Sequence, residues 1–177
     1  MTSAELAAEE LGRAYLADVA ARFAALRDLA ERAVVQVDDA RFFESLDDES
    51  NSIAVLMKHV GGNLRSRFTD FLTTDGEKPE RDRDGEFLTG SDDSRERVES
   101  AWAAGWRALE WTIASLEPED LLCTVTLRGD AISVLQALSR ALAHVAQHTG
   151  QIVLLSKHAA GDRWRTLSIP KAPRPPR

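Results

Sequence analysis

Apolar residues recur every three or four positions along four stretches of the chain, which is the spacing of one face of an amphipathic α-helix. Ser3 can cap the first stretch ahead of an acidic first turn, Asp130 is expected to cap the fourth, and Pro118 should stop the third. The four helices predicted in this way cover residues 3–37, 52–72, 94–116 and 131–158.

The segments between these stretches lack a continuous apolar face. Residues 73–93, "TTDGEKPERDRDGEFLTGSDD", are dense in charge and contain glycines and a proline, so they predict a loop. Its length is unusual for a connection between packed helices, which favours a functional role for the charged part at 75–90. "LLCTVTLRGDA" alternates weakly and fits either a short extended pair or a loop.

Four long amphipathic helices without a convincing sheet predict an all-α protein, a four-helix bundle. The expected organisation is one domain at 1–169, with a long charged loop between the second and third helices. Residues 170–177 are rich in proline, so an extended and flexible tail is expected there.

The net charge of −7 and a pI near 5.1 argue against a nucleic-acid partner, because such binding depends on Lys and Arg that neutralise phosphates. The same balance gives no support for docking on an anionic membrane. The chain has no long apolar run and no signal-like start, and Cys123 is its only cysteine. We therefore expect a cytoplasmic protein in which Cys123 is a small buried or half-buried residue.

"HVAQHTGQ" places His144 and His148 four residues apart on the fourth helix. Residues at this spacing project the same way, so the two imidazoles can converge on one divalent ion. On a helical wheel they lie on the shoulder of the apolar stripe. Two half-exposed histidines that the helix tolerates are an equally simple interpretation, since the motif is short and common.

His59 lies in the second helix, where His59, Asn63 and Arg67 form a row at four-residue spacing beside the apolar face. Gly61 and Gly62 fall inside the same helix, and each costs about 1 kcal/mol against alanine. That cost indicates a close approach by a neighbouring helix or a ligand. His59 with the pair on the fourth helix would form a three-nitrogen site with an open position, the composition of a catalytic metal centre. The fourth histidine, His158, is expected to interact with the helix dipole.

Three segments, "NSIAVLMKHVGGNLRSRFTDFLTTDGEKPERDRDGEF", "ALSRALAHVAQHTGQIVLLSKH" and "WRTLSIPK", resemble the DinB/YfiT-like superfamily, in particular its branch of unknown function. The resemblance implies a four-helix bundle, often a homodimer, with a divalent metal bound by residues that match His59, His144 and His148. Zn²⁺ or Ni²⁺ are the expected ions. Glu80 and Phe68 stand where tryptophans are expected, which leaves the ligand set intact.

Relatives in that superfamily use the metal to deprotonate a low-molecular-weight thiol. The resemblance therefore implies a thiol S-transferase or a hydrolase acting on a small-molecule substrate. The alternative is a non-catalytic metal-binding bundle, such as a stress-associated dimer.

The resemblance also suggests that the charged loop folds over the open end of the site. Its arginines could bind a substrate carboxylate. One of its carboxylates could orient a ligand histidine or serve as a general base, the candidates being Asp75, Glu77, Asp84 and Glu86. The candidate substrate-binding residues are Asn63, Arg67, Asp70 and Arg81. A solvated loop held by its own ion pairs is the competing interpretation. Three tryptophans are assigned to the core or a dimer interface: Trp102, Trp106 and Trp111.

Overall fold

The structure is a computed structural model that describes residues 2–170. The chain is mostly helical, with five α-helices, short 3-10 turns and one small two-stranded sheet. The elements run in the order α1 (Ser3–Val34), α2 (Asp39–Phe42), α3 (Ile53–Phe68), η1 (Gly85–Phe87), α4 (Arg95–Ser115), η2 (Pro118–Leu122), β1 (Thr124–Leu127), β2 (Asp130–Ser133), α5 (Val134–Ala160) and η3 (Gly161–Arg163).

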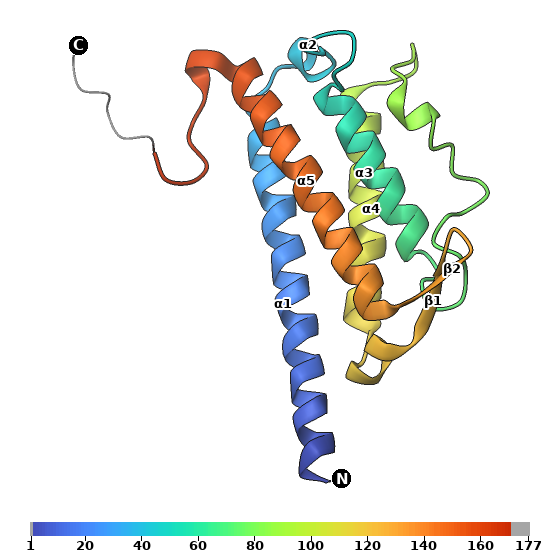
Figure 1. Ribbon diagram of the computed structural model, residues 1–177. Helices are drawn as coiled ribbons and strands as arrows, with labels where there is room; N and C mark the ends of the chain where they lie inside the picture. The colour runs from blue at the N-terminus through green and yellow to red at the C-terminus, as the bar shows by residue number, and fades with distance from the viewer. Residues whose placement is uncertain (1, 171–177) are drawn as a thin grey trace.

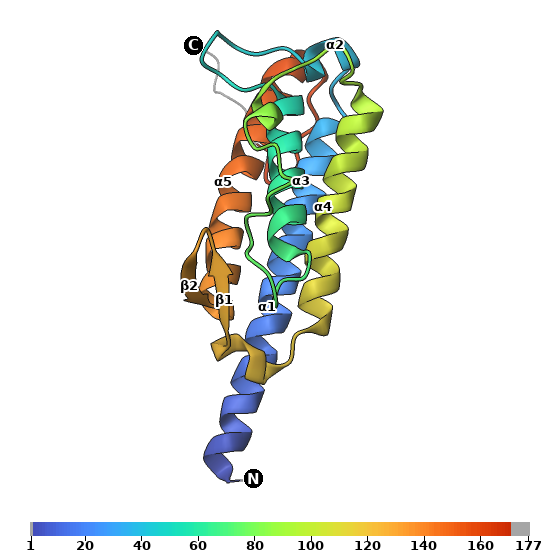
Figure 2. The same ribbon diagram turned by 90° about the vertical axis from the view of Figure 1, so that its right-hand side faces the viewer.

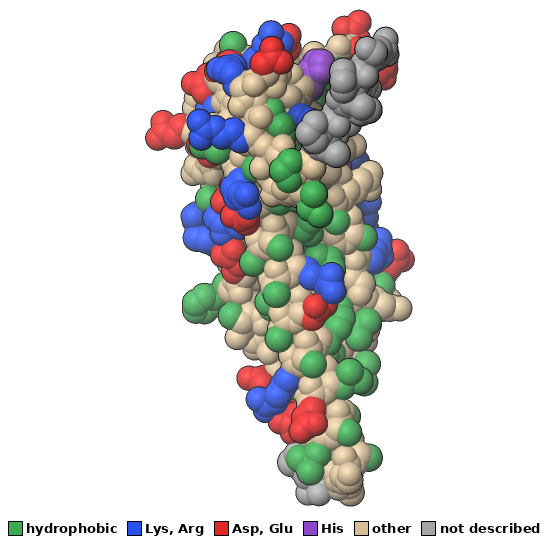
Figure 3. All heavy atoms as spheres, turned by 90° about the vertical axis from the view of Figure 1, so that its left-hand side faces the viewer, with side chains coloured by type: hydrophobic (Ala, Val, Ile, Leu, Met, Phe, Trp, Pro, Cys, Tyr) green, Lys and Arg blue, Asp and Glu red, His purple; other side chains and the backbone are tan. Residues whose placement is uncertain are grey.

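Four long helices, α1, α3, α4 and α5, lie side by side (Figures 1 and 2). They are organised as two pairs, because α3 packs mainly on α4 whereas α1 packs mainly on α5. The first turns of α1 project beyond the other helices, and hydrophobic side chains gather along the lower part of the face on which α1 lies (Figure 3). In the described part of the chain, no helix has the length and apolarity that crossing a membrane requires.

Side-chain caps set where the long helices begin. Thr2 caps α1 in a reciprocal capping box with Glu5, so the expected cap Ser3 is instead the first helical residue. A serine caps each of α3, α4 and α5 by accepting a hydrogen bond from a backbone N–H. The cap of α5 is Ser133, so the assignment of this role to Asp130 was wrong. Asp130 instead opens β2 and pairs with Leu127 across the hairpin.

The extended pair is the correct alternative for the segment before α5. β1 and β2 are antiparallel, and the turn between them has positive φ at Arg128 (56°) and Gly129 (81°). Two-residue hairpin turns of this kind match the twist of the strands that they join. The hairpin positions Arg128 close to the charged loop.

Two predicted helices end earlier than the apolar pattern suggests. α1 stops at Val34 and α3 at Phe68, yet Val37 and Phe71 beyond them are still buried. The apolar pattern therefore extends past the helix ends because these residues are buried without being helical. After α1 the chain changes direction at Asp38, whose side chain caps the short helix α2, which the sequence did not predict. The Pro-rich tail expected at 170–177 lies, apart from Pro170, outside the described residues.

The core lies between the four long helices. Trp106 is fully buried and packs edge-to-face on Phe23, while Trp102 is buried beside it. Trp111 is 80% exposed on α4, so it lies outside the core, and its place in a dimer interface stays a prediction. Cys123 is also exposed, so the burial expected for it was wrong.

The two helices of the α3–α4 pair approach one another at glycines. A Cβ atom built on Gly105 would lie 2.8 Å from the Cα of Gly61, and one built on Gly61 would lie 2.9 Å from the Cα of Trp102. Side chains at these positions cannot fit, because backbone atoms cannot move aside as a flexible side chain can. The expected close approach of a neighbouring helix is therefore confirmed at Gly61.

Gly105→Ala should lower the free energy of unfolding by about 2 kcal/mol. The steric clash of the new methyl group with the backbone of α3 destabilises the fold by more than the higher helix propensity of alanine stabilises it. Urea unfolding followed by circular dichroism measures this change. Gly150→Ala is the matched control, since no heavy atom lies within 4 Å of a Cβ at Gly150, also within a helix. A destabilisation of the same size in both variants would contradict the packing argument.

Candidate metal centre

Three histidines meet at the seam between the two helix pairs. His59 projects from α3, while His144 and His148 project from α5. One ring nitrogen from each histidine can be chosen so that all three lie within 4.8 Å of one another. His59 Nε2 and His144 Nε2 are 3.0 Å apart, and the ring centroids are separated by 4.5 to 5.1 Å. The 3.0 Å separation is compatible with bonds of about 2.0–2.1 Å from His59 and His144 to one ion.

His59 is held in a fixed orientation by the loop between α3 and α4. The side chain is buried, and its Nδ1 donates a hydrogen bond to Glu86 Oε2 at 3.1 Å. The ring of Phe87 packs against the imidazole with the centroids 4.7 Å apart. Because Nδ1 is taken up by Glu86, the other ring nitrogen, Nε2, is the one that faces His144.

Glu86 is itself held by Arg81 through a two-pronged ion pair. Arg81 Nε donates to Oε1 at 2.8 Å and Arg81 Nη2 donates to Oε2 at 2.7 Å, with only 4% and 10% of the two side chains exposed. Burial favours the neutral form of Glu86, but the hydrogen bonds from Arg81 and His59 outweigh it, so the pKa of Glu86 is lowered. Glu86 is therefore ionised and accepts the hydrogen bond from His59 Nδ1.

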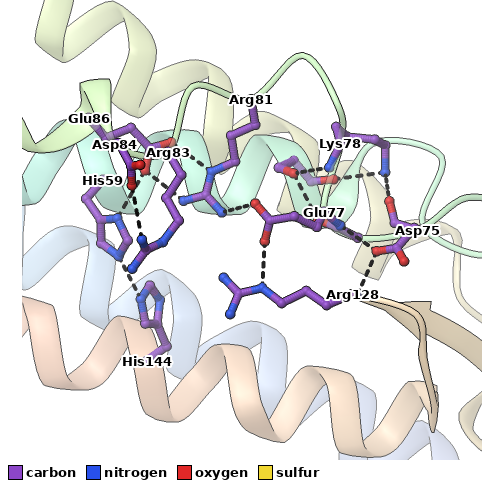
Figure 4. A network of polar contacts seen from close by, with 12 residues as sticks. His59, Asp75, Glu77, Lys78, Arg81, Arg83, Asp84, Glu86, Arg128 and His144 are labelled. Atoms are coloured by element: carbon purple, nitrogen blue, oxygen red, sulfur yellow. Dashed lines mark hydrogen bonds and ion pairs between the residues drawn. The ribbon is translucent and has the colours of Figure 1, made fainter.

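The same chain of contacts continues to the hairpin (Figure 4). Arg81 also donates to Glu77, and Glu77 pairs with Arg128 at 3.0 Å. Asp75 accepts hydrogen bonds from the backbone N–H groups of Arg128 and Gly129. The charged loop thus connects the β-hairpin to the back of His59. The ion pairs of Arg81 with Glu77 and Glu86 lie within the loop, as expected for a loop held by its own charges, and Glu86 also contacts His59.

Gly62 is the position on α3 that admits Glu86. A Cβ atom at Gly62 would lie 2.8 Å from Glu86 Cδ, so any larger residue would displace the carboxylate from His59. The two adjacent glycines therefore serve different neighbours. Gly61 admits helix α4, and Gly62 admits the carboxylate behind the histidine.

The two histidines of α5 differ in their support. His148 Nδ1 donates to Gln151 Oε1 at 2.7 Å, which leaves its Nε2 free to act as a ligand. Burial, together with the neighbouring charges of His148 and His59, lowers the pKa of His144 to about 3. Burial also lowers the pKa of His148. Both imidazoles are therefore neutral at physiological pH, the form that binds metal ions.

The residues present fit a divalent metal ion. Three imidazoles converge, and in two of them, His59 and His148, the ring nitrogen on the far side is hydrogen-bonded to a side-chain oxygen. His144 lacks this support, since its Nδ1 is buried without a hydrogen-bond partner in the described chain. The cluster could hold a metal ion, and His144 is its least constrained member.

The four candidate substrate-binding residues have separate locations. Asn63 is buried one turn along α3 from His59, and Arg67 is half-buried a further turn along. Asp70 is exposed beyond the end of α3, where its backbone carbonyl closes a turn. Arg81 lies behind His59, and its guanidinium is bonded to Glu86 and Glu77.

Two residues of the site were not identified from the sequence. Gln151 follows His148 by three positions on one helix, and that spacing was the available signal. Phe87 gave no signal, because its contact with His59 depends on the path of a long loop. Glu86 was one of several loop carboxylates considered, and only the fold distinguishes it.

A family model described as "Protein of unknown function (DUF1572)" matches residues 10–173. No curated protein and no solved structure matches the chain.

The metal-free protein should lose stability as the pH falls from 6.5 towards 3. In that window the unfolded chain binds a proton at His144, whose ordinary pKa is 6.5, whereas the folded protein, with this pKa at about 3, does not. Urea midpoints at pH 5.0 and 7.5 measure the effect, and His144→Gln should shrink the difference between them. An equal pH dependence in the wild type and His144→Gln would show that His144 is not held neutral by the fold.

Proposed function

We propose that this chain, which belongs to the DUF1572 family of proteins of unknown function, binds a divalent metal ion through His59, His144 and His148 and uses it in catalysis. The observation that carries the proposal is the support behind His59, where Glu86 and Arg81 are buried at the cost of desolvating two charges. A merely tolerated histidine does not require such an arrangement. Zn²⁺ or Ni²⁺ suit three imidazole ligands.

The composition of the site favours chemistry at an open coordination position. When bound, the ion supplies Lewis acidity that lowers the pKa of a thiol or a water molecule, which suits a small-thiol S-transferase or a hydrolase. The protein supplies fixed ligand orientation from Glu86 and Gln151 and a partly buried setting at the seam. Glu86 is already bonded to Arg81 and His59, so we assign it to positioning and not to general base catalysis.

The proposal also includes a DinB/YfiT-like four-helix bundle that acts in the cytoplasm as a homodimer. The side-by-side arrangement of the four long helices supports the first part. Exposed apolar side chains beside the projecting end of α1, among them Leu11 (72% exposed) and Leu122 (83% exposed), support a second copy as a partner. They line an apolar groove between α1 and η2.

Untagged protein purified without chelators should contain close to one equivalent of metal per chain by elemental analysis, and His144→Ala should lose it while keeping the helical circular dichroism spectrum. Removing one of three ligands leaves only two, which is too few for a catalytic-type site. His158→Ala is the matched control, because His158 is an exposed histidine on the same helix outside the cluster. Metal-free wild-type protein under these conditions would refute the proposal.

The metal-loaded protein should transfer a small thiol to an electrophile, or hydrolyse a test ester, at a rate that His148→Ala reduces to the uncatalysed level. A panel of low-molecular-weight thiols and model electrophiles, followed by mass spectrometry, provides the measurement. The alternative function is a non-catalytic bundle in which the ion only stiffens the helices. It is favoured if chelation lowers the melting temperature strongly while no member of the panel turns over.

A further inference from the structure

An arginine without a carboxylate partner lies two helical turns from His59. Arg67 is half-buried, and its Nε is buried with no hydrogen-bond partner in the described chain. A buried cationic side chain normally has a partner, because desolvation of an unpaired charge costs several kcal/mol. Two other arginines of this region, Arg81 and Arg128, each form an ion pair with Glu77. Arg67 therefore presents unused hydrogen-bonding capacity.

Two further polar groups lie on the same side of the histidines. Arg140 precedes His144 by one turn on α5, and it is exposed. Asn63 lies between His59 and Arg67 on α3, is only 3% exposed, and has a buried Oδ1 without a partner. The helices α3 and α5 run in opposite directions, and the end of α3 and the start of α5 both lie towards the β-hairpin (Figure 1). Arg67 follows His59 towards the end of α3, and Arg140 precedes His144 towards the start of α5, so both are on the hairpin side of the histidines.

The local charge is the opposite of that of the whole protein. Arg67 is close enough to three other arginines for their charges to act on it, and burial together with those charges lowers its pKa. Three carboxylates in the same network, Glu77, Glu86 and Asp75, oppose the four arginines, and all three are already bound in ion pairs or hydrogen bonds. This region is thus cationic in a chain whose net charge is −7. Such a concentration of unpaired positive charge attracts anions.

We propose that Arg67, with Asn63 and Arg140, forms an oxyanion-binding subsite beside the three histidines, so that the substrate carries a carboxylate or a phosphate group. The proposal rests on the proposed function and specifies its substrate class. The planar guanidinium of Arg67 can bind two oxygens of either group, and Arg140 adds a second cation at the rim. Asn63 offers its amide to a polar group of the bound molecule between the oxyanion and the histidines.

Binding of three small probes tests the subsite: malonate, inorganic phosphate and the neutral analogue malonamide. Calorimetry and thermal shift on metal-loaded wild-type protein should detect binding of malonate or phosphate and no binding of malonamide. Arg67→Met should weaken the binding of the anion at least ten-fold, and Arg140→Met should weaken it less, because Arg140 is exposed. Arg107→Met is the matched control, since Arg107 is an exposed arginine on α4, and it should bind as the wild type does.

The stability of the variants distinguishes a binding residue from a structural one. Without anion, Arg67→Met should melt at the same temperature as the wild type or higher, because a buried unpartnered nitrogen is removed. Arg67→Lys keeps the charge but not the planar fork, so it should bind with intermediate affinity. A lower melting temperature for Arg67→Met together with unchanged anion binding would overturn the proposal, as would equal binding of malonamide.

Metal content and probe binding are measured on the same samples, which separates the two proposals. A wild-type protein that holds metal but binds neither anion overturns the subsite alone. A protein without metal that still binds an anion through Arg67 overturns the metal centre and leaves the subsite standing. A response to only one of malonate and phosphate assigns the oxyanion to that group.

Discussion

The buried ion pair between Arg81 and Glu86 is the interaction on which the site depends. Removing two charges from water is costly, and only the two parallel hydrogen bonds and the third bond to His59 offset that cost. The pair does not join two structural elements of the core. It lies in a charged loop and fixes one imidazole ring. Much of what is unusual about this chain, including Gly62 and the density of charge at 75–90, follows from the need to bring that carboxylate to the back of His59.

The sequence predicted the helices well where burial and periodicity agree, and less well at their ends. Val37 and Phe71 extend the apolar pattern although the helices have stopped, since a buried residue need not be helical. Two of the histidines share a helix face, the third lies in a helix with two costly glycines, and the family resemblance groups all three. Glu86 could not be singled out among the loop carboxylates, because the path of a long loop is set by distant contacts with the hairpin.

The histidines have paired charged groups on one side and polar atoms without hydrogen-bond partners on the other. Behind His59 every charged group is paired, from Glu86 through Arg81 and Glu77 to Arg128. Towards the hairpin, on the histidine side of that network, Asn63 and Arg67 keep polar atoms without partners. Native proteins rarely leave such groups unsatisfied without a reason. The contrast supports the proposal that the first side positions the histidines and the second binds a molecule from outside.

The division into an α1–α5 pair and an α3–α4 pair affects how the proposed metal ion would change the stability of the protein. An ion bound at the seam would cross-link two halves that share a smaller interface than the helices within each pair. Because the ion would bind the folded form alone, it would raise the stability of that form by mass action. Metal starvation would then loosen the seam and expose the chain to proteases, so the amount of protein would follow the supply of its ion.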